Sequence, residues 1–321
     1  MRAIGAKVTS LVALTILIML LAFPSRALAQ APESGRLKVV ATHSILGDFV
    51  LKVAGDAVDL TTLVGPDGDT HTYEPVPADT IKVADADLLV ENGLSFETWL
   101  DDLYDASGSH AQRVVVTSRI VPLGFTGEGM AANEEPVASP APDQELDPHF
   151  WQDVANSESA VEVIRDALVA ADPTNAEVYQ ADATAYLQQL QQLDDDIVAN
   201  TASLPADRRK LVTNHDAFGY FAYRYGYTIE GAALQSFSTE AADPSAQQLA
   251  ALVTAIRETG VPAIFPESVE KADLIDRIAK EAGVKVGAAL YSDALGQPGS
   301  DGDTYLKMMG HNIDAIVSAL Q

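Results

Sequence analysis

The sequence predicts an α/β protein of two lobes, each a parallel sheet flanked by helices, with one long rigid helix joining them. Short apolar runs alternate with stretches of helical periodicity, a pattern typical of parallel sheets covered on both faces. The alternation occurs once in each half of the 321-residue chain, which is longer than one hydrophobic core usually organises. Between the halves lies a long helical stretch without glycine or proline. These observations favour two lobes with a rigid connection.

Residues 1–29 are expected to be a signal peptide. Arg2 and Lys7 give a basic start, an apolar run follows over residues 11–23, and a small-x-small pattern ends at Ala29. The apolar run is shorter than a membrane span requires, and an uncleaved anchoring helix is the alternative. We therefore expect an exported, periplasmic protein whose signal peptide is cleaved after Ala29.

The composition restricts the chemistry and the partners. The chain contains no cysteine, which excludes disulfides, thiolate metal ligands and cysteine nucleophiles and predicts that no lipid anchor is attached to an N-terminal cysteine. The formal net charge is −26. Such a field repels nucleic acid and attracts cations, although solubility alone also explains it. We expect a monomer without a nucleic-acid partner.

The N-terminal lobe is predicted over residues 30–172. Its strands are short apolar runs with helical segments between some of them: Leu37–Val40, Leu60–Val64, Leu88–Val90 and Val114–Val116. Near the end of this lobe, residues 124–147 are rich in proline, alanine and acids and contain no basic residue. An acidic flexible loop is expected there.

The linking helix is predicted over residues 173–206. Its apolar residues recur mostly at three- or four-residue steps and so share one helical face: Tyr179, Tyr186, Leu190, Leu193 and Ile197. A helix of this length spans on the order of 45 Å. That length suits a connection between two lobes.

The C-terminal lobe is predicted over residues 207–321, and it repeats the pattern of the first. The expected strands are Leu211–Thr213, Tyr227–Ile229, Ala263–Phe265 and Val284–Leu290. Apolar stripes at helical spacing within residues 249–256, 274–282 and 306–320 predict helices beside these strands.

Four side chains that could bind a metal occupy loops after predicted strands or before a predicted helix. His71 and His215 follow strands, His149 precedes a helix, and Asp293 follows the strand ending at Leu290. Ligands in open parallel sheets bind beyond the carboxyl ends of the strands. Three imidazoles and one carboxylate suit a tetrahedral zinc site. Any one of the histidines could equally be an ordinary loop or core residue, so the prediction depends on their joint placement.

The segments around these positions carry specific motifs, which follow one another through nearly the whole chain: Thr70–Asp79, Ala84–Gly93, Phe96–Leu100, Asp147–Asp153, Thr213–Gly226, Ile264–Glu267 and Thr304–Met309. In sequence and in order they resemble the zinc/manganese solute-binding proteins of ABC transporters. The resemblance implies two α/β lobes joined by a rigid helix. It also implies that His71, His149, His215 and Asp293 bind the ion.

The resemblance further implies a function: high-affinity capture of Zn²⁺, with Mn²⁺ as the alternative, and delivery to the membrane permease of an ABC transporter. A third imidazole at His215, where some relatives have glutamate, favours zinc. Two features depart from the family. Asp69-Thr70 stands where Asp-Pro is usual, and residues 124–147 are acidic where many zinc members are rich in histidine.

Other residues near these motifs receive supporting roles. His43 ends the first strand, and a structural or supporting role is predicted for it rather than ligation. Glu267 is expected to orient a ligand imidazole, because such rings commonly bond an outer carboxylate. His110 and His311 are predicted to lie on the surface. Trp99 and Trp151 are predicted to be packing residues.

Two functions compete with transport. A secreted zinc hydrolase needs an open coordination position and a general base, and the chain has no His-Glu-x-x-His motif. A metal-binding surface adhesin, or a passive metal buffer, needs no transporter. Four protein ligands leave no position for an activated water, so we expect a binding protein and not an enzyme. The rigid helix favours small movements of loops and of the C-terminal lobe over wide opening.

Overall fold

The computed structural model describes residues 35–125, 134–141, 144–240, 244–270 and 272–321. The predicted signal peptide lies outside these residues. Residues Arg36–Gln321 form one compact unit, within which we call residues up to 172 the N-terminal lobe and residues from 207 the C-terminal lobe. None of the described helices combines the length and the apolar character that a bilayer crossing needs.

The N-terminal lobe is built on a four-stranded parallel sheet in the order β2-β1-β3-β4. Its strands are β1 (Leu37–His43), β2 (Val58–Val64), β3 (Leu88–Glu91) and β4 (Gln112–Val115). Consecutive residues of β1 are buried, as in strands whose two faces are both covered. Val39 and Ala41 face one hydrophobic cluster, and Val40 faces another. The predicted parallel sheet is confirmed.

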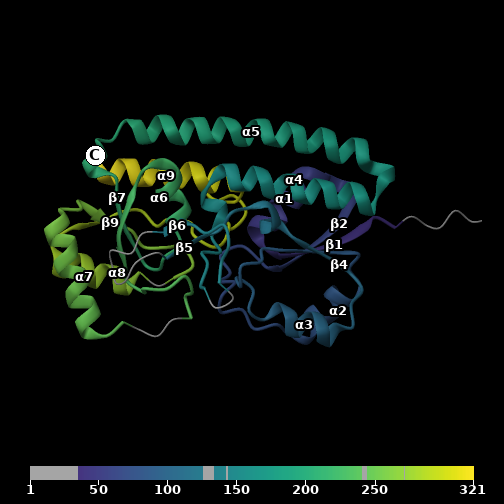
Figure 1. Ribbon diagram of the computed structural model, residues 1–321, viewed down its shortest axis with the longest axis horizontal. Helices are drawn as coiled ribbons and strands as arrows, with labels where there is room; N and C mark the ends of the chain where they lie inside the picture. The colour runs from purple at the N-terminus through teal and green to yellow at the C-terminus, as the bar shows by residue number, and fades with distance from the viewer. Residues whose placement is uncertain (1–34, 126–133, 142–143, 241–243, 271) are drawn as a thin grey trace, which may run out of the picture. The chain divides into compact units, whose positions relative to one another are not determined.

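Helices cover both faces of this sheet (Figure 1). They are α1 (Ser44–Ala54), α2 (Pro77–Ala84), α3 (Leu100–Ser107) and α4 (Val154–Ala171). Residues of α1 and α4 share the cluster of Val39, whereas residues of α2 and α3 share that of Val40. The short 3₁₀ turns of the chain are η1 (Gly55–Ala57), η2 (Val116–Arg119), η3 (Phe150–Gln152), η4 (Pro173–Asn175) and η5 (Ala206–Arg208).

Part of the acidic segment 124–147 is paired. β5 (Leu123–Phe125) and β6 (Glu134–Pro136) form an antiparallel pair, and Gly124 also bridges to Leu146. The sequence did not predict this pairing. Residues 126–133 and 142–143 of the segment lie outside the described residues.

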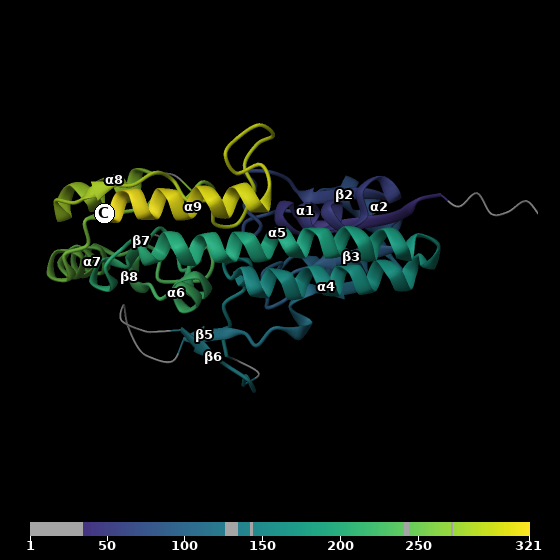
Figure 2. The same ribbon diagram turned by 90° about the horizontal axis from the view of Figure 1, so that it is seen from above.

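The linking helix is α5 (Ala176–Ala202), 27 residues long. The face predicted from its periodicity is buried, including Tyr179, Tyr186, Leu190 and Ile197. It packs against α1 and α4 of the N-terminal lobe and against α6 and α9 of the C-terminal lobe. Figures 1 and 2 show α5 running alongside both lobes.

The C-terminal lobe contains two parallel strand pairs, β7 (Lys210–Thr213) with β8 (Thr228–Ala232) and β9 (Ala263–Ile264) with β10 (Lys285–Val286). A hydrogen bond from Phe265 N to Val212 O, 2.9 Å long, joins the pairs. The helices are α6 (Gly219–Tyr225), α7 (Ala246–Thr259), α8 (Asp273–Ala282) and α9 (Tyr305–Leu320). Ser245 and Gln248 form a capping box at the start of α7.

The predicted strand Val284–Leu290 is shorter than expected. Only Lys285 and Val286 pair as a strand, although Leu290 forms an isolated bridge with Glu267. The chain passes close under the ring of Phe265 at Gly287, where a Cβ atom would lie 2.5 Å from that ring. This close approach explains why glycine interrupts the apolar run.

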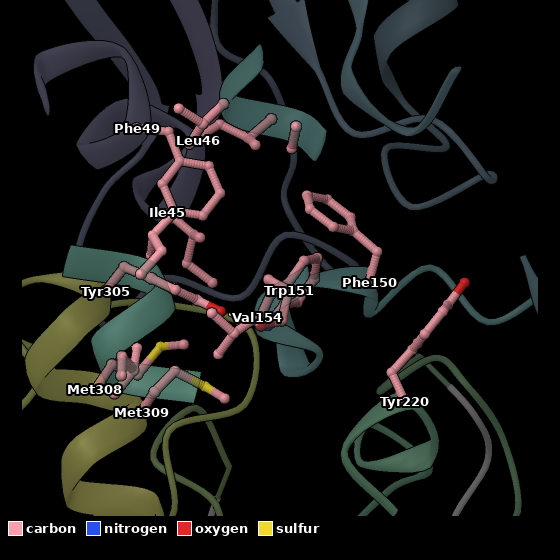
Figure 3. Packing of buried hydrophobic residues seen from close by; sticks show 14 of the residues in the cluster. Ile45, Leu46, Phe49, Phe150, Trp151, Val154, Tyr220, Tyr305, Met308 and Met309 are labelled. Atoms are coloured by element: carbon pink, nitrogen blue, oxygen red, sulfur yellow. Dashed lines mark hydrogen bonds between the residues drawn. The ribbon is translucent and has the colours of Figure 1, made fainter. Parts of the chain in front are cut away.

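One hydrophobic cluster continues from the N-terminal lobe into α9 of the C-terminal lobe. Figure 3 shows Phe49 and Trp151 on one side of this contact and Tyr305 and Met309 on the other. The Tyr305 hydroxyl donates to Trp151 O at 2.6 Å. The lobes are therefore joined by packed side chains as well as by α5.

Candidate metal centre

The four predicted side chains meet at one point. His71 lies in the loop between β2 and α2, His149 directly precedes η3, His215 follows β7, and Asp293 follows the bridge residue Leu290. Each offers one ligand atom, and these atoms all lie within 4.8 Å of one another. His71 is 5% exposed and the other three side chains are 0% exposed. Loops of both lobes thus bring the group together.

The spacing of the ligand atoms suits a small tetrahedral ion. Nε2 of His71 and Nε2 of His149 are 3.4 Å apart. The Asp293 carboxylate oxygens lie 3.2 Å from Nε2 of His215, 3.4 Å from Nε2 of His149 and 3.7 Å from Nε2 of His71. Ligand atoms about 2.0–2.1 Å from a tetrahedral Zn²⁺ are separated by about 3.3 Å. These four separations are close to this value, and the whole group lies within 4.8 Å.

Carboxylates behind two of the rings fix which nitrogen faces the centre. Nδ1 of His149 is hydrogen-bonded to Asp147 at 2.7 Å, and Nδ1 of His215 lies 2.6 Å from Glu267. The other oxygen of Glu267 accepts the backbone N–H groups of Asn214 and His215. Both rings are thereby turned so that Nε2 points to the centre, an arrangement common in metal sites.

Glu267 therefore lies where the sequence predicted a carboxylate that orients a ligand ring. Asp147 was not assigned a role, although it precedes His149 by two residues. A carboxylate at this spacing can accept from both the backbone N–H and the ring of the histidine, and Asp147 does so at 2.9 and 2.7 Å. The Asp-x-His spacing is the signal that could have identified it.

Three of the four side chains have shifted pKa values, and the causes of the shifts differ. Burial lowers the pKa of His71 to about 3, despite the nearby Asp293. Burial acts in the same direction on His215, but the carboxylates of Glu267 and Asp293 outweigh it and raise its pKa well above the usual value. Burial would raise the pKa of Asp293, yet His215 and the other imidazoles hold it well below its usual range. These directions favour a proton on His215 over one on His71 or Asp293.

Asp293 is held by the N-terminal lobe, although it comes late in the sequence. Ser292 O accepts from Trp151 Nε1 at 2.7 Å. Leu295 N donates to Ser44 Oγ at 2.9 Å. The segment around Asp293 thus crosses to the lobe that carries His71 and His149. On its other side the segment is bonded to α9 of the C-terminal lobe, since Tyr291 N donates to Asn312 Oδ1 at 2.9 Å and Tyr291 O accepts from Asn312 Nδ2 at 2.8 Å. Asp293 is therefore held by both lobes, and His215 by the C-terminal lobe.

The remaining histidines lie outside the group of four. His43 is buried between Phe96 and Trp151, with ring centroids 5.2 and 5.4 Å away. His110 is exposed, as predicted. His311 is only partly exposed, because its Nε2 is 2.9 Å from Ala289 O and its ring packs on Tyr291.

The two tryptophans are packing residues that also bond loop carbonyls. Trp151 is fully buried, and Trp99, which is half-buried, donates from Nε1 to Thr70 O at 2.9 Å. The bond from Trp99 fixes the backbone directly before His71. Both residues therefore support the loops of the metal centre from behind.

The chain has two α/β lobes joined by one long helix, and three imidazoles and a carboxylate are buried between the lobes. This combination defines the metal-binding class of solute-binding proteins. Within that class the chain belongs to the family described as zinc-uptake complex component A, periplasmic, whose model matches residues 39–319.

Relatives in this family are named for the metals that they bind. The manganese-binding lipoprotein MntA of Halalkalibacterium halodurans is 36% identical over 284 residues, 88% of each chain. The zinc-binding protein TroA of Treponema pallidum is 34% identical over 295 residues, covering 90% of this chain and 91% of TroA. The solved structure of TroA matches with a TM-score of 0.79, covering 89% of this chain and 99% of that one.

A solved structure with manganese bound is also similar. The Mn-bound periplasmic metal-binding protein of Candidatus Liberibacter asiaticus is 27% identical, with a TM-score of 0.76, covering 88% of this chain and 99% of the other. The shared fold therefore occurs in proteins named for different divalent metals.

Proposed function

We propose that the chain captures a divalent transition metal ion through His71, His149, His215 and Asp293 and delivers it to the membrane permease of an ABC transporter. The observation that carries this proposal is the convergence of four buried ligand atoms within 4.8 Å of one another. The names of the relatives, manganese-binding for MntA and zinc-binding for TroA, support the same function.

The ligand chemistry favours Zn²⁺, with Mn²⁺ as the alternative cargo. Imidazole suits zinc, whereas manganese prefers more carboxylate, carbonyl and water ligands. Four protein ligands fill a tetrahedral site and leave no position for a metal-activated water. Binding is therefore favoured over hydrolysis, and we propose that the chain is not an enzyme.

We propose that the protein acts as a monomer in the periplasm. Relatives include a protein named periplasmic and a protein named lipoprotein. The 321 residues contain no cysteine to which a lipid could be attached. This composition supports a periplasmic protein without a lipid anchor.

The proposal predicts one tightly bound transition metal ion per chain. Elemental analysis of protein purified without an affinity tag should find Zn²⁺ near equimolar amounts, and titration of the stripped protein should give one high-affinity site. Deletion of the gene should impair growth under chelation, and added metal should restore it. Protein that binds neither zinc nor manganese, or that hydrolyses ester or peptide substrates with robust zinc-dependent turnover, would contradict the proposal.

The affinity for Zn²⁺ should rise with pH through the neutral range. His215 keeps a proton below its raised pKa, and an ion must displace that proton to bind. His71, with a pKa of about 3, is already neutral and releases none. Apparent affinity should therefore fall about tenfold per pH unit on acidification, beginning above the usual histidine value of 6.5.

Calorimetry in buffers of different ionisation enthalpy measures this exchange directly. We expect about one proton to be released per ion at neutral pH. Binding that releases no proton would show that His215 is neutral in the metal-free protein.

A further inference from the structure

A segment of the C-terminal lobe spans the metal centre. Residues 233–240, which we call the strap, follow β8 and begin beside His215. Two backbone hydrogen bonds join the strap to the residues on either side of that histidine: Leu234 N to Asn214 O at 2.7 Å and Asp216 N to Ser236 O at 3.0 Å. The first half of the strap is therefore fixed to the side of the centre that carries His215.

The far end of the strap is bonded to the opposite side. Thr239 Oγ1 donates to Asp69 Oδ2 at 2.7 Å, and Asp69 Oδ1 accepts the backbone N–H of His71 at 2.9 Å. One carboxylate thus joins the strap to the backbone of a predicted ligand. Both Thr239 and Asp69 are half-buried, so their hydrogen bond is partly protected from water.

The strap borders a cavity beside the centre. A cavity of about 160 Å³ lies beside His71, and Phe237 and Ser238 of the strap line one part of it. Leu94 and Glu145 are among the residues that line the rest. His71 is also the one predicted ligand with any exposed surface. The exposed edge of His71 and the strap therefore border the same cavity.

The hydrogen bond between Thr239 and Asp69 joins the two sides of the centre. His71 and His149 belong to the N-terminal lobe, whereas the segment of Asp293 is bonded to both lobes. His215 is attached to the C-terminal lobe. A movement that separates His215 from His71 also carries the strap away from Asp69, because the strap is bonded to the neighbours of His215, and the Thr239 hydrogen bond resists this movement.

We propose that the Thr239–Asp69 hydrogen bond is a latch that limits how fast the ion leaves the centre, with Thr239 as a positioning residue. This inference rests on the proposed function of the same site. The latch does not contact the ion and acts through the strap and through the backbone of His71.

The test is the rate at which zinc leaves the full-length protein. Zn²⁺-loaded protein is mixed with an excess of a chromogenic chelator in a stopped-flow instrument. Thr239→Val keeps the shape of the side chain but removes the hydroxyl donor, and it should speed release about tenfold, the lower end of what a hydrogen bond to a charged group contributes. Thr239→Ser keeps the donor and should release zinc at the wild-type rate.

Two controls separate a latch from a general loss of structure. Thr254→Val makes the same substitution at an exposed site on α7, where the hydroxyl bonds only within its own helix, and it should leave the release rate unchanged. In the background of Asp69→Ala, Thr239→Val should add nothing, because its partner is already absent. Without metal, Thr239→Val should lower the unfolding temperature by only about 3 °C, and Thr239→Ser should leave it unchanged.

Wild-type release kinetics in Thr239→Val, failure of Thr239→Ser to restore the rate, or full additivity with Asp69→Ala would overturn the latch while leaving the metal site intact. A wild-type protein that binds no zinc would instead overturn the proposed function, and the latch with it. The two failures are therefore distinguishable in the same experiment.

Discussion

Replacement of His215 with alanine should lower the affinity for Zn²⁺ by roughly a hundredfold to a thousandfold. A zinc site of four protein ligands contributes about 10–16 kcal/mol of binding, so that one ligand accounts for about 3–4 kcal/mol, and each 1.4 kcal/mol is a factor of about ten. The substitution also leaves the carboxylate of Glu267, 2.6 Å from the ring in the native protein, buried without its partner. Calorimetric titration of both proteins after metal removal measures the loss.

Two further variants make this result specific. Glu267→Gln keeps the ring of His215 but weakens its outer contact, and it should lose about ten- to a hundredfold, less than His215→Ala. His110→Ala makes the same substitution at an exposed histidine and should bind like the wild type. Equal zinc affinity of His215→Ala and wild-type protein would exclude His215 as a ligand.

The sequence predicted the fold because a strand of a parallel sheet that is buried on both faces is apolar at consecutive positions. The run at Val39–Ala41 is apolar at every position, since successive side chains face different helices. The buried face of α5 was predicted for a similar reason, because Tyr179 and Ile197 lie on the one side of the helix that is buried along its length. The rule that ligands bind beyond the carboxyl ends of parallel strands favoured His71, His215 and Asp293, and the family motifs implied the full set with His149, which follows no strand.

Features that depend on single contacts between distant segments were not predictable. No periodicity shows that the segment of Asp293 bonds to Ser44, 251 positions from Leu295. The pairing of β5 with β6 and the bond between Thr239 and Asp69 are of the same kind. Each joins polar groups whose partners are set by the folded backbone, so the sequence near either partner carries no sign of the other.

Addition of Zn²⁺ to the stripped protein should raise its unfolding temperature by about 8 °C at a free metal concentration near a thousand times the dissociation constant. At that concentration an ion that binds only the folded state contributes about 4 kcal/mol, and 1 kcal/mol shifts the midpoint of a chain of this size by about 2 °C. The bound ion places a positive charge beside the fully buried carboxylate of Asp293, and pairing a buried charge is favourable.

The absence of cysteine makes the unfolded chain a weak competitor for zinc, which keeps the shift close to its full value. Scanning calorimetry with and without a chelator measures it, and the chelator should return the midpoint to that of the stripped protein. Mg²⁺, which requires octahedral oxygen ligands, should produce no shift, and His215→Ala should lose most of the response to Zn²⁺. A Zn²⁺ shift of the same size in His215→Ala would mean that the stabilising ion binds elsewhere, because a centre reduced to two imidazoles and one carboxylate cannot retain the affinity on which the shift depends.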